Sequence, residues 1–152
     1  MSYTANKLKA SALRKLVDFD PDAATAVVAT LFPGAAEKGL ALAKYAFQAY
    51  LVGVIRTIGT GAVTLIEIVT ADAADMTGHV TVIASRSATP ADAVGDTVWL
   101  ECTGEEVGAL KAATNLYLGV RVTLATSTDE CVLYFEAGRG RAQDGLTADY
   151  VS

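Results

Sequence analysis

Few residues of this sequence combine the type and the spacing that catalysis requires. His79 is the one histidine, it follows Gly78 at the start of an expected strand, and no Gly-x-Ser-x-Gly motif supplies a nucleophile. A zinc site needs a cluster of ligands, and one histidine with two distantly spaced cysteines falls short. We therefore expect His79 to be an exposed residue at a strand end, and we expect no catalytic residue, metal ion or cofactor.

The acidic residues do not form a recognisable site either. Asp18, Asp20 and Asp22 resemble the start of a calcium loop, but Pro21 and the lack of a suitably placed Gly and Glu break the pattern. A glycosidase needs a pair of carboxylates, and any β-sandwich offers such pairs by chance. The carboxylates that could form one here are Glu67, Glu101, Glu105, Glu106, Asp129, Glu130 and Glu136. The segment 59–61, Gly-Thr-Gly, joins two expected strands without a following helix that could hold phosphate. The chain is therefore not expected to be an enzyme.

Two aromatic residues leave an alternative open. In the expected strand Thr97 to Cys102, Trp99 takes one face, and the inward face carries Val98, Leu100 and Cys102. Trp99 and Tyr134 could stack on sugars, as aromatic residues of carbohydrate-binding sandwiches do, or they could contact the core of a second sheet, which is the more frequent fate of a strand aromatic.

Composition and charge limit the class of protein. The 152 residues are 52% hydrophobic and only 19% charged, which fits either a surface that a partner covers or a small, well-packed sandwich. The net charge of −5 argues against general binding of nucleic acid. No apolar run approaches the roughly 20 residues of a membrane span, and the N-terminus lacks a signal-peptide pattern. Cys102 and Cys131 are expected to be buried, free thiols, although a disulfide between neighbouring strands stays open.

The spacing of the apolar residues predicts the secondary-structure elements. Leu116 to Glu136 alternates on both sides of the polar segment 125–129, which predicts a β-hairpin. Further strands are expected at Tyr50 to Ile58, Val63 to Thr70, His79 to Ala84 and Thr97 to Cys102. A tight turn should join the first two of these, and the long segment 86–96 should cross between sheets. Thr103 and Glu106 form a capping-box pattern for one short helix through about Ala113. At least six strands with turn signals predict an antiparallel β-sandwich.

The N-terminal third is harder to interpret. Residues 1–17 are basic and are read as an arm, and Asp20-Pro21 is typical of a helix start. Ala23 to Leu31 would then be a short helix, although its β-branched residues make an extended segment a fair competitor. For 35–48 both readings stand, with an extended tether preferred. The expected organisation is an arm or tether over 1–45, a sandwich over 46–137 and a tail over 138–152.

Parts of the sequence are similar in style and layout to one protein family. A loose N-terminal arm, strands such as VTLIEIVTA, the turn TSTDE before CVLYFEAG, and a polar tail ending LTADYVS resemble the capsid cement (decoration) proteins of tailed bacteriophages. The resemblance covers roughly residues 45–152. It implies a jelly-roll-like sandwich with one short helix and extended N- and C-terminal arms.

The resemblance also implies a function. The chain would be a non-enzymatic virion protein, made in the host cytoplasm, that binds the outside of the capsid and links neighbouring major capsid subunits. Its partners would be the major capsid protein and itself, as a dimer or trimer, and neither nucleic acid nor a membrane. The contacts are expected from the two termini: Lys7, Lys9, Arg14, Lys15, Arg139, Arg141, Leu146 and Tyr150. A carbohydrate-binding sandwich on a virion or cell surface is the alternative.

Overall fold

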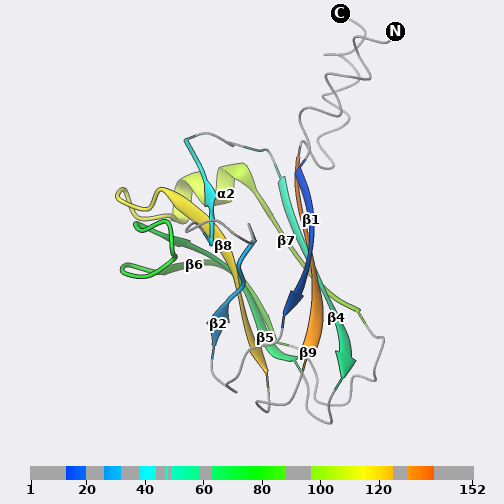
Figure 1. Ribbon diagram of the computed structural model, residues 1–152. Helices are drawn as coiled ribbons and strands as arrows, with labels where there is room; N and C mark the ends of the chain where they lie inside the picture. Colours follow the sequence, from blue (N-terminus) through cyan, green and yellow to red (C-terminus); the bar gives the residue numbers. More distant parts are fainter. Residues whose placement is uncertain are drawn as a thin grey trace, which may run out of the picture.

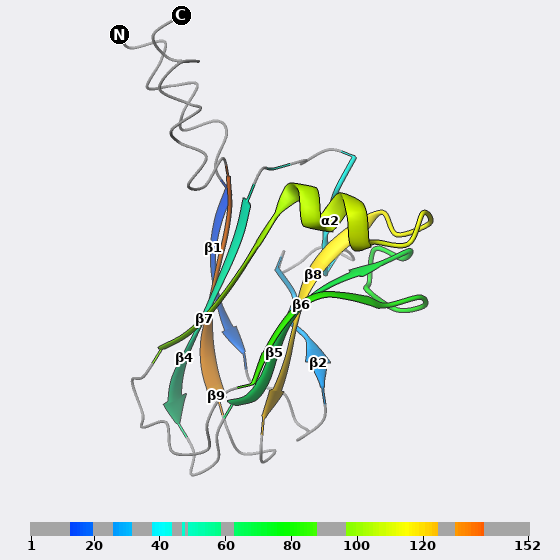
Figure 2. The ribbon, with the colours of Figure 1, turned by 180° about the vertical axis from the view of Figure 1, so that it is seen from behind.

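Two antiparallel sheets face each other in the computed structural model, which describes residues 13–19, 26–31, 38–43, 47, 49–58, 63–87, 97–124 and 130–138. Figures 1 and 2 show the sheets from two sides, with helix α2 at one end. Sheet A contains β1 (Leu13–Phe19), β4 (Ala49–Ile58), β7 (Thr97–Thr103) and β9 (Glu130–Gly138). Sheet B contains β2 (Val27–Val28), β3 (Leu40–Ala41), β5 (Val63–Ala71), β6 (Thr81–Ser87) and β8 (Tyr117–Leu124). Helix α2 spans Gly104–Leu110.

The strand pairs are nested along the chain. The first strand, β1, pairs with the last, β9, while β2 pairs with β8, β4 with β7, and β5 with β6. Two further pairs, β4 with β9 and β5 with β8, join these ribbons into sheets of order β1-β9-β4-β7 and β2-β8-β5-β6. A long antiparallel ribbon wound over itself gives this order, which is the jelly-roll arrangement. The prediction of an all-β, jelly-roll-like sandwich is therefore confirmed.

The predicted hairpin over Leu116 to Glu136 is wrong. Strand β8 lies in sheet B and β9 in sheet A, so the connection between them crosses from one sheet to the other. The tight turn expected over 59–61 lies outside the described residues, but β4 and β5 lie in different sheets, so this segment does not join them into a hairpin. The predicted crossing over 86–96 is confirmed, because β6 and β7 lie in different sheets. Period-two patterns identify a strand with one buried face, but they do not identify its neighbour.

The predicted N-terminal arm also needs correction. Leu13–Phe19 is an edge strand of the sandwich, with Leu13 paired to Ala137 and Phe19 to Cys131. The charged residues Arg14 and Lys15 obscure the alternation of apolar and polar residues in this strand. Its partner strand, β9, lies at the other end of the chain. The helix predicted over Ala23 to Leu31 is wrong at Val27–Val28, where the extended competitor holds. Within 35–48, Leu40–Ala41 is extended, as preferred. The helix start at Asp20-Pro21 lies outside the described residues.

The core fills the space between the sheets. Its fully buried side chains alternate along the central strands: Val52, Val54, Ile66, Ile68, Val120, Val122, Leu133 and Phe135. Helix α2 adds Val107 to this cluster. The predicted capping box is present: the Thr103 hydroxyl accepts from the Glu106 amide at 3.1 Å, and the Glu106 carboxylate accepts from the Thr103 amide at 2.7 Å. These bonds lower the pKa of Glu106.

Replacing Thr103 by Ala should destabilise the chain by about 1 kcal/mol, because an amide at the start of α2 loses its acceptor. Urea denaturation at neutral pH measures this loss. The Glu106 carboxylate contributes above the ordinary pKa of glutamate, about 4.3, and its contribution is lost as the pH falls through its lowered pKa. The Thr103 hydroxyl also donates to the Glu106 carboxylate at 3.0 Å, and T103A removes this bond while the bond from the backbone amide remains. The gap between the wild type and T103A should therefore narrow at acid pH, where Glu106 is protonated. A gap that widens on acidification would contradict this account.

Part of the outer face of sheet B is covered by the chain itself. The segment after β5 folds back so that Met76, which has a φ of 63°, packs on Val69 and Ala71. A Cβ at Gly39 would clash with the Met76 sulfur, and one at Gly119 would come within 2.9 Å of its methyl group. Because neither glycine has a side chain, both positions leave room for the side chain of Met76. Sheet B therefore has a second, smaller hydrophobic cluster on its outside.

Candidate interaction surface

Sheet A carries a row of apolar and aromatic residues on its outer face. Inward-facing Leu100 and Cys102 on β7 leave Trp99 on the outer face. The register then places four positions side by side across the whole sheet: Leu16 on β1, Tyr134 on β9, Gly53 on β4 and Trp99 on β7. We call these four residues the aromatic row. Leu16 is 70% exposed and Trp99 is 44% exposed, so one row across the sheet presents two large apolar side chains to solvent.

Gly53 fixes the position of the Trp99 ring. A Cβ at Gly53 would lie 2.5 Å from Cζ3 and 2.8 Å from Cε3 of the indole, so the six-membered ring lies over the glycine. Tyr134 meets Trp99 edge to face, with ring centroids 6.1 Å apart and an interplanar angle of 74°. The prediction that Trp99 faces away from the core is confirmed, and the expectation that it contacts a second sheet is wrong.

Charged residues lie along one side of the aromatic row. On one side, the next row of the register contains three charged residues, Arg14, Glu136 and Glu101, with Leu51 among them. The Tyr134 hydroxyl donates to the Glu136 carboxylate, which raises the pKa of Tyr134. Arg14 Nε lies 3.5 Å from the same carboxylate. An apolar centre with charged residues along one side fits the composition of protein interfaces, whose rim is polar.

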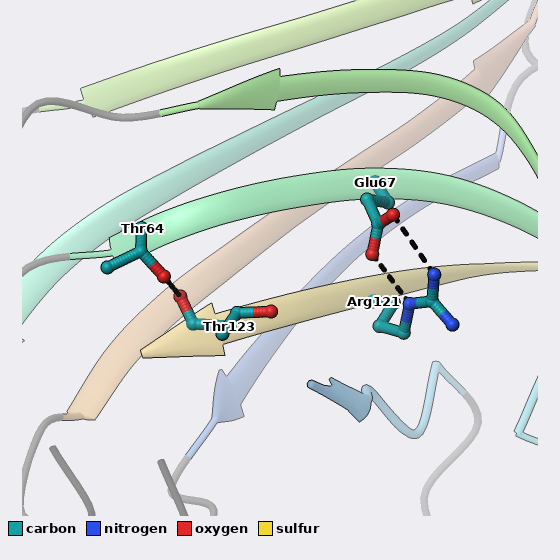
Figure 3. Close-up of polar contacts among 4 residues, drawn as sticks. All are labelled: Thr64, Glu67, Arg121 and Thr123. Atoms are coloured by element: carbon teal, nitrogen blue, oxygen red, sulfur yellow. Dashed lines mark hydrogen bonds and ion pairs between the residues drawn. The ribbon is translucent and has the colours of Figure 1, made fainter. Parts of the chain in front are cut away.

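Unlike the outer face of sheet A, the outer face of sheet B has an ion pair at its centre. Arg121 on β8 donates to both carboxylate oxygens of Glu67 on β5, at 2.6 and 3.0 Å (Figure 3). Next to this pair, the Thr64 hydroxyl donates to the Thr123 carbonyl at 3.1 Å. The Glu67 side chain is 8% exposed and that of Arg121 is 24% exposed. The hydrogen bond to Glu67 also raises the pKa of Arg121. The Glu67–Arg121 pair joins two strands and leaves little of Glu67 open to a ligand.

Two of the eight predicted contact residues lie in the described part of the chain. Arg14 and Lys15 are both on β1, and Arg14 pairs with Glu136. The other six lie outside the described residues: Lys7, Lys9, Arg139, Arg141, Leu146 and Tyr150. Because Leu13 pairs with Ala137, the segments 1–12 and 139–152 are attached at neighbouring points of sheet A. Sequence reasoning missed the aromatic row, since only the register brings Leu16 beside Tyr134.

The residues that we considered for catalysis are exposed or are held by other side chains, as the following contacts show. His79 is exposed, and its backbone amide donates to Asp72. Of the candidate carboxylates, Glu67 is held by Arg121, Glu106 by the capping box, and Glu136 by Tyr134 and Arg14. Within the described ranges, no three His, Cys, Asp or Glu side chains gather so as to hold a metal ion. No helix in that part of the chain is long and apolar enough to cross a membrane.

Both cysteines are buried thiols that form no disulfide, as predicted. Cys102 pairs with position 50 of β4 and Cys131 with position 56, so about six residues, or about 20 Å, separate them along the strand. A disulfide requires Cα atoms within about 7 Å. Burial raises the pKa of Cys102 to about 12, which keeps the thiol protonated.

We expect the native chain to react slowly with a thiol reagent such as dithionitrobenzoate at pH 8. Burial blocks access and the raised pKa disfavours the reactive thiolate. In denaturant both of the two cysteines should react at once. Rapid labelling of the folded chain, or fewer than two reactive thiols after unfolding without reductant, would contradict the structure.

Comparisons with known proteins add little. No protein-family model matches the chain, and no curated protein matches its sequence. Among solved structures, it is similar to a chain from Bacillus endospore appendages, described as a novel family of disulfide-linked pili, at 15% identity. The alignment covers 84% of this chain and 86% of the other, with a TM-score of 0.41. A likeness of that size carries no information on function.

Proposed function

We propose that the chain is a non-enzymatic virion protein that binds the outside of a bacteriophage capsid and links neighbouring major capsid subunits. The observation that carries a docking role is the exposed aromatic row on sheet A. The choice of a phage capsid as the partner comes from the resemblance of the sequence to cement proteins.

The chemistry of the row favours a protein partner. Trp and Tyr are enriched among the residues that dominate protein binding, because they bury much apolar area while fixing few rotatable bonds. Trp99 and Tyr134 already hold each other edge to face, so little side-chain freedom is lost when a partner covers them. The Arg14–Glu136 pair at the border supplies charges that set orientation.

The terminal segments extend the proposed contacts. Lys7 and Lys9 precede β1, whereas Arg139 and Arg141 follow β9, and the two strands are neighbours at that end. In this proposal the two segments reach capsid subunits beside the one that sheet A covers. Each contact can be weak, because many copies on a lattice bind through several linked contacts at once.

Co-sedimentation with shells that lack the chain tests the proposal. The full chain should bind saturably, and Trp99→Ala should weaken binding by about tenfold or more. Removal of residues 1–12 or of residues 139–152 from the wild-type chain should also weaken binding to the shells. Leu110→Ala is the matched control, since Leu110 is an exposed apolar residue on α2, 54% exposed and outside sheet A. Failure of the full chain to bind, or equal binding by W99A and the wild type, would contradict the proposal.

A carbohydrate-binding sandwich is the second candidate. It is favoured by the indole of Trp99 lying over Gly53 while 44% of the residue is exposed, with the Tyr134–Glu136 pair nearby as a source of hydrogen bonds to sugar hydroxyls. A glycan array separates the two functions. Sugar binding should disappear in W99A and survive removal of either terminal segment, whereas capsid binding should depend on both.

A further inference from the structure

The indole of Trp99 has one covered face and one open face. A Cβ at Gly53 would lie 2.5, 2.8 and 2.9 Å from three adjacent atoms of the six-membered ring, Cζ3, Cε3 and Cη2. Nearly equal distances to three adjacent atoms place that Cβ against the flat face of the ring rather than against its edge. The backbone of β4 therefore covers the inner face of the indole. Because Trp99 is still 44% exposed, its outer face is open to solvent.

Tyr134 lies beside this open face. Its ring makes an angle of 74° with the indole, and the two ring centroids are 6.1 Å apart. Since the indole lies flat on the sheet, a ring at this angle stands away from the sheet, and the two rings enclose a corner. A cation is attracted by an aromatic ring within about 6 Å of its centroid. A cation over the outer face of the indole can therefore interact with both rings.

The charges around this corner favour a cation. The face of an aromatic ring is negative, and the Tyr134 hydroxyl donates to the Glu136 carboxylate, which increases the electron density of the phenol ring. The Glu136 side chain is 30% exposed, and a carboxylate can accept more bonds than those from Tyr134 and Arg14. Arg14 is itself a cation that offsets part of this negative charge, with Nε 3.5 Å from Glu136. The chain as a whole has a net charge of −5.

Another cation of the chain lies close to Trp99 but binds its backbone. Arg86 on β6 donates from Nη1 to the Trp99 carbonyl at 2.7 Å. Strand β6 belongs to sheet B and β7 to sheet A, so this bond links the two sheets. The indole instead extends over Gly53 of the neighbouring strand β4. The outer face of the indole is therefore left for a group that a partner supplies.

We propose that the corner between Trp99 and Tyr134 binds an arginine side chain of the partner protein. A guanidinium is planar and weakly hydrated, so it stacks on an aromatic face more readily than the ammonium of lysine. Its N–H groups can donate to the Glu136 carboxylate while its plane lies on the indole. A sugar ring would stack on the indole face alone, whereas an arginine uses both rings and the carboxylate.

This inference deepens the proposed function and rests on it for the identity of the partner. If the chain binds a capsid through sheet A, the capsid protein should present an arginine to Trp99. Arginine is enriched, together with Trp and Tyr, among the residues that dominate protein binding. The preference of the corner for a guanidinium is a property of the chain alone, so it can be measured without a capsid.

An NMR titration of the isotope-labelled full chain tests the inference. The sequence contains one tryptophan, so the indole Nε1–H gives one cross-peak. N-acetyl-arginine amide should shift this peak with a dissociation constant in the millimolar range. N-acetyl-citrulline amide is the matched probe, because its side chain has nearly the same size and planar shape but no charge. At equal ionic strength it should bind about fivefold more weakly or less.

Two variants change the affinity for the arginine probe in opposite directions. Tyr134→Leu keeps the reporter Trp99 but loses one ring, and should raise the dissociation constant by about threefold or more. Arg14→Gln removes a competing cation from Glu136, and should lower the dissociation constant. Leu110→Ala, on α2 and outside sheet A, should leave it unchanged. Circular dichroism confirms that each variant folds.

Several results would overturn the inference: equal affinity for the arginine and citrulline probes, weaker binding of the arginine probe by folded Arg14→Gln, or no shift of the indole peak. An indole peak that responds to oligosaccharides but not to the arginine probe would also overturn it, in favour of the second candidate function. A chain that binds capsid shells but not the probe overturns this inference alone. A chain that binds the probe but no shells supports the inference and contradicts the proposed function.

Discussion

Phe135→Ala should lower the free energy of unfolding by about 3–5 kcal/mol, which makes it one of the two most damaging single substitutions that we expect. The Phe135 side chain is fully buried on β9, the strand between β1 and β4 in sheet A. Its ring lies 6.4 Å from that of Tyr50, so its removal opens a cavity between the sheets and takes away an aromatic contact. Urea denaturation followed by circular dichroism measures the loss.

Phe135→Leu is the matched control, because it keeps most of the apolar volume. It should cost clearly less, about 1–2 kcal/mol. If Phe135→Ala unfolds at nearly the same urea concentration as the wild type, the position of β9 at the centre of sheet A is wrong.

The second large effect is expected from Arg121→Met. This substitution leaves the carboxylate of Glu67, which is 8% exposed, without its bidentate partner, and breaking a buried pair in this way costs about 3 kcal/mol at neutral pH. The apolar stem of Met retains part of the packing of Arg121, so the lost charge partner dominates the effect. The same denaturation experiment measures it.

The double variant Glu67→Leu and Arg121→Met separates charge from packing. Replacing both partners with apolar residues removes the unpaired charge, so the double variant should regain most of the lost stability. If it is no more stable than Arg121→Met alone, the Glu67–Arg121 pair does not have the role that its geometry indicates.

Local features of the fold could be predicted from the sequence. The alternation of apolar residues located β4, β5, β7, β8 and β9, and the Thr103–Glu106 capping box located the start of α2. These signals are short-range, since each depends on residues within one element. The inward side of Leu100 and Cys102, and with it the outward side of Trp99, also follows from period two alone.

The features that the sequence did not reveal depend on contacts between distant parts of the chain. Which strand pairs with which is decided by contacts between distant parts of the chain, so the hairpin assigned to β8 and β9 was wrong and β1 was mistaken for part of an arm. The aromatic row is of the same kind, because Leu16, Tyr134 and Trp99 come from three separate strands. The terminal residues expected to contact a capsid remain a prediction.

Electron cryomicroscopy of capsid shells with and without saturating amounts of the chain tests the proposed function most directly. The proposal predicts added density over the junctions between capsid subunits, with the outer face of sheet A toward the shell and Trp99 covered. Shells that gain no density, or a bound chain that turns sheet B toward the shell and leaves Trp99 exposed, would contradict it.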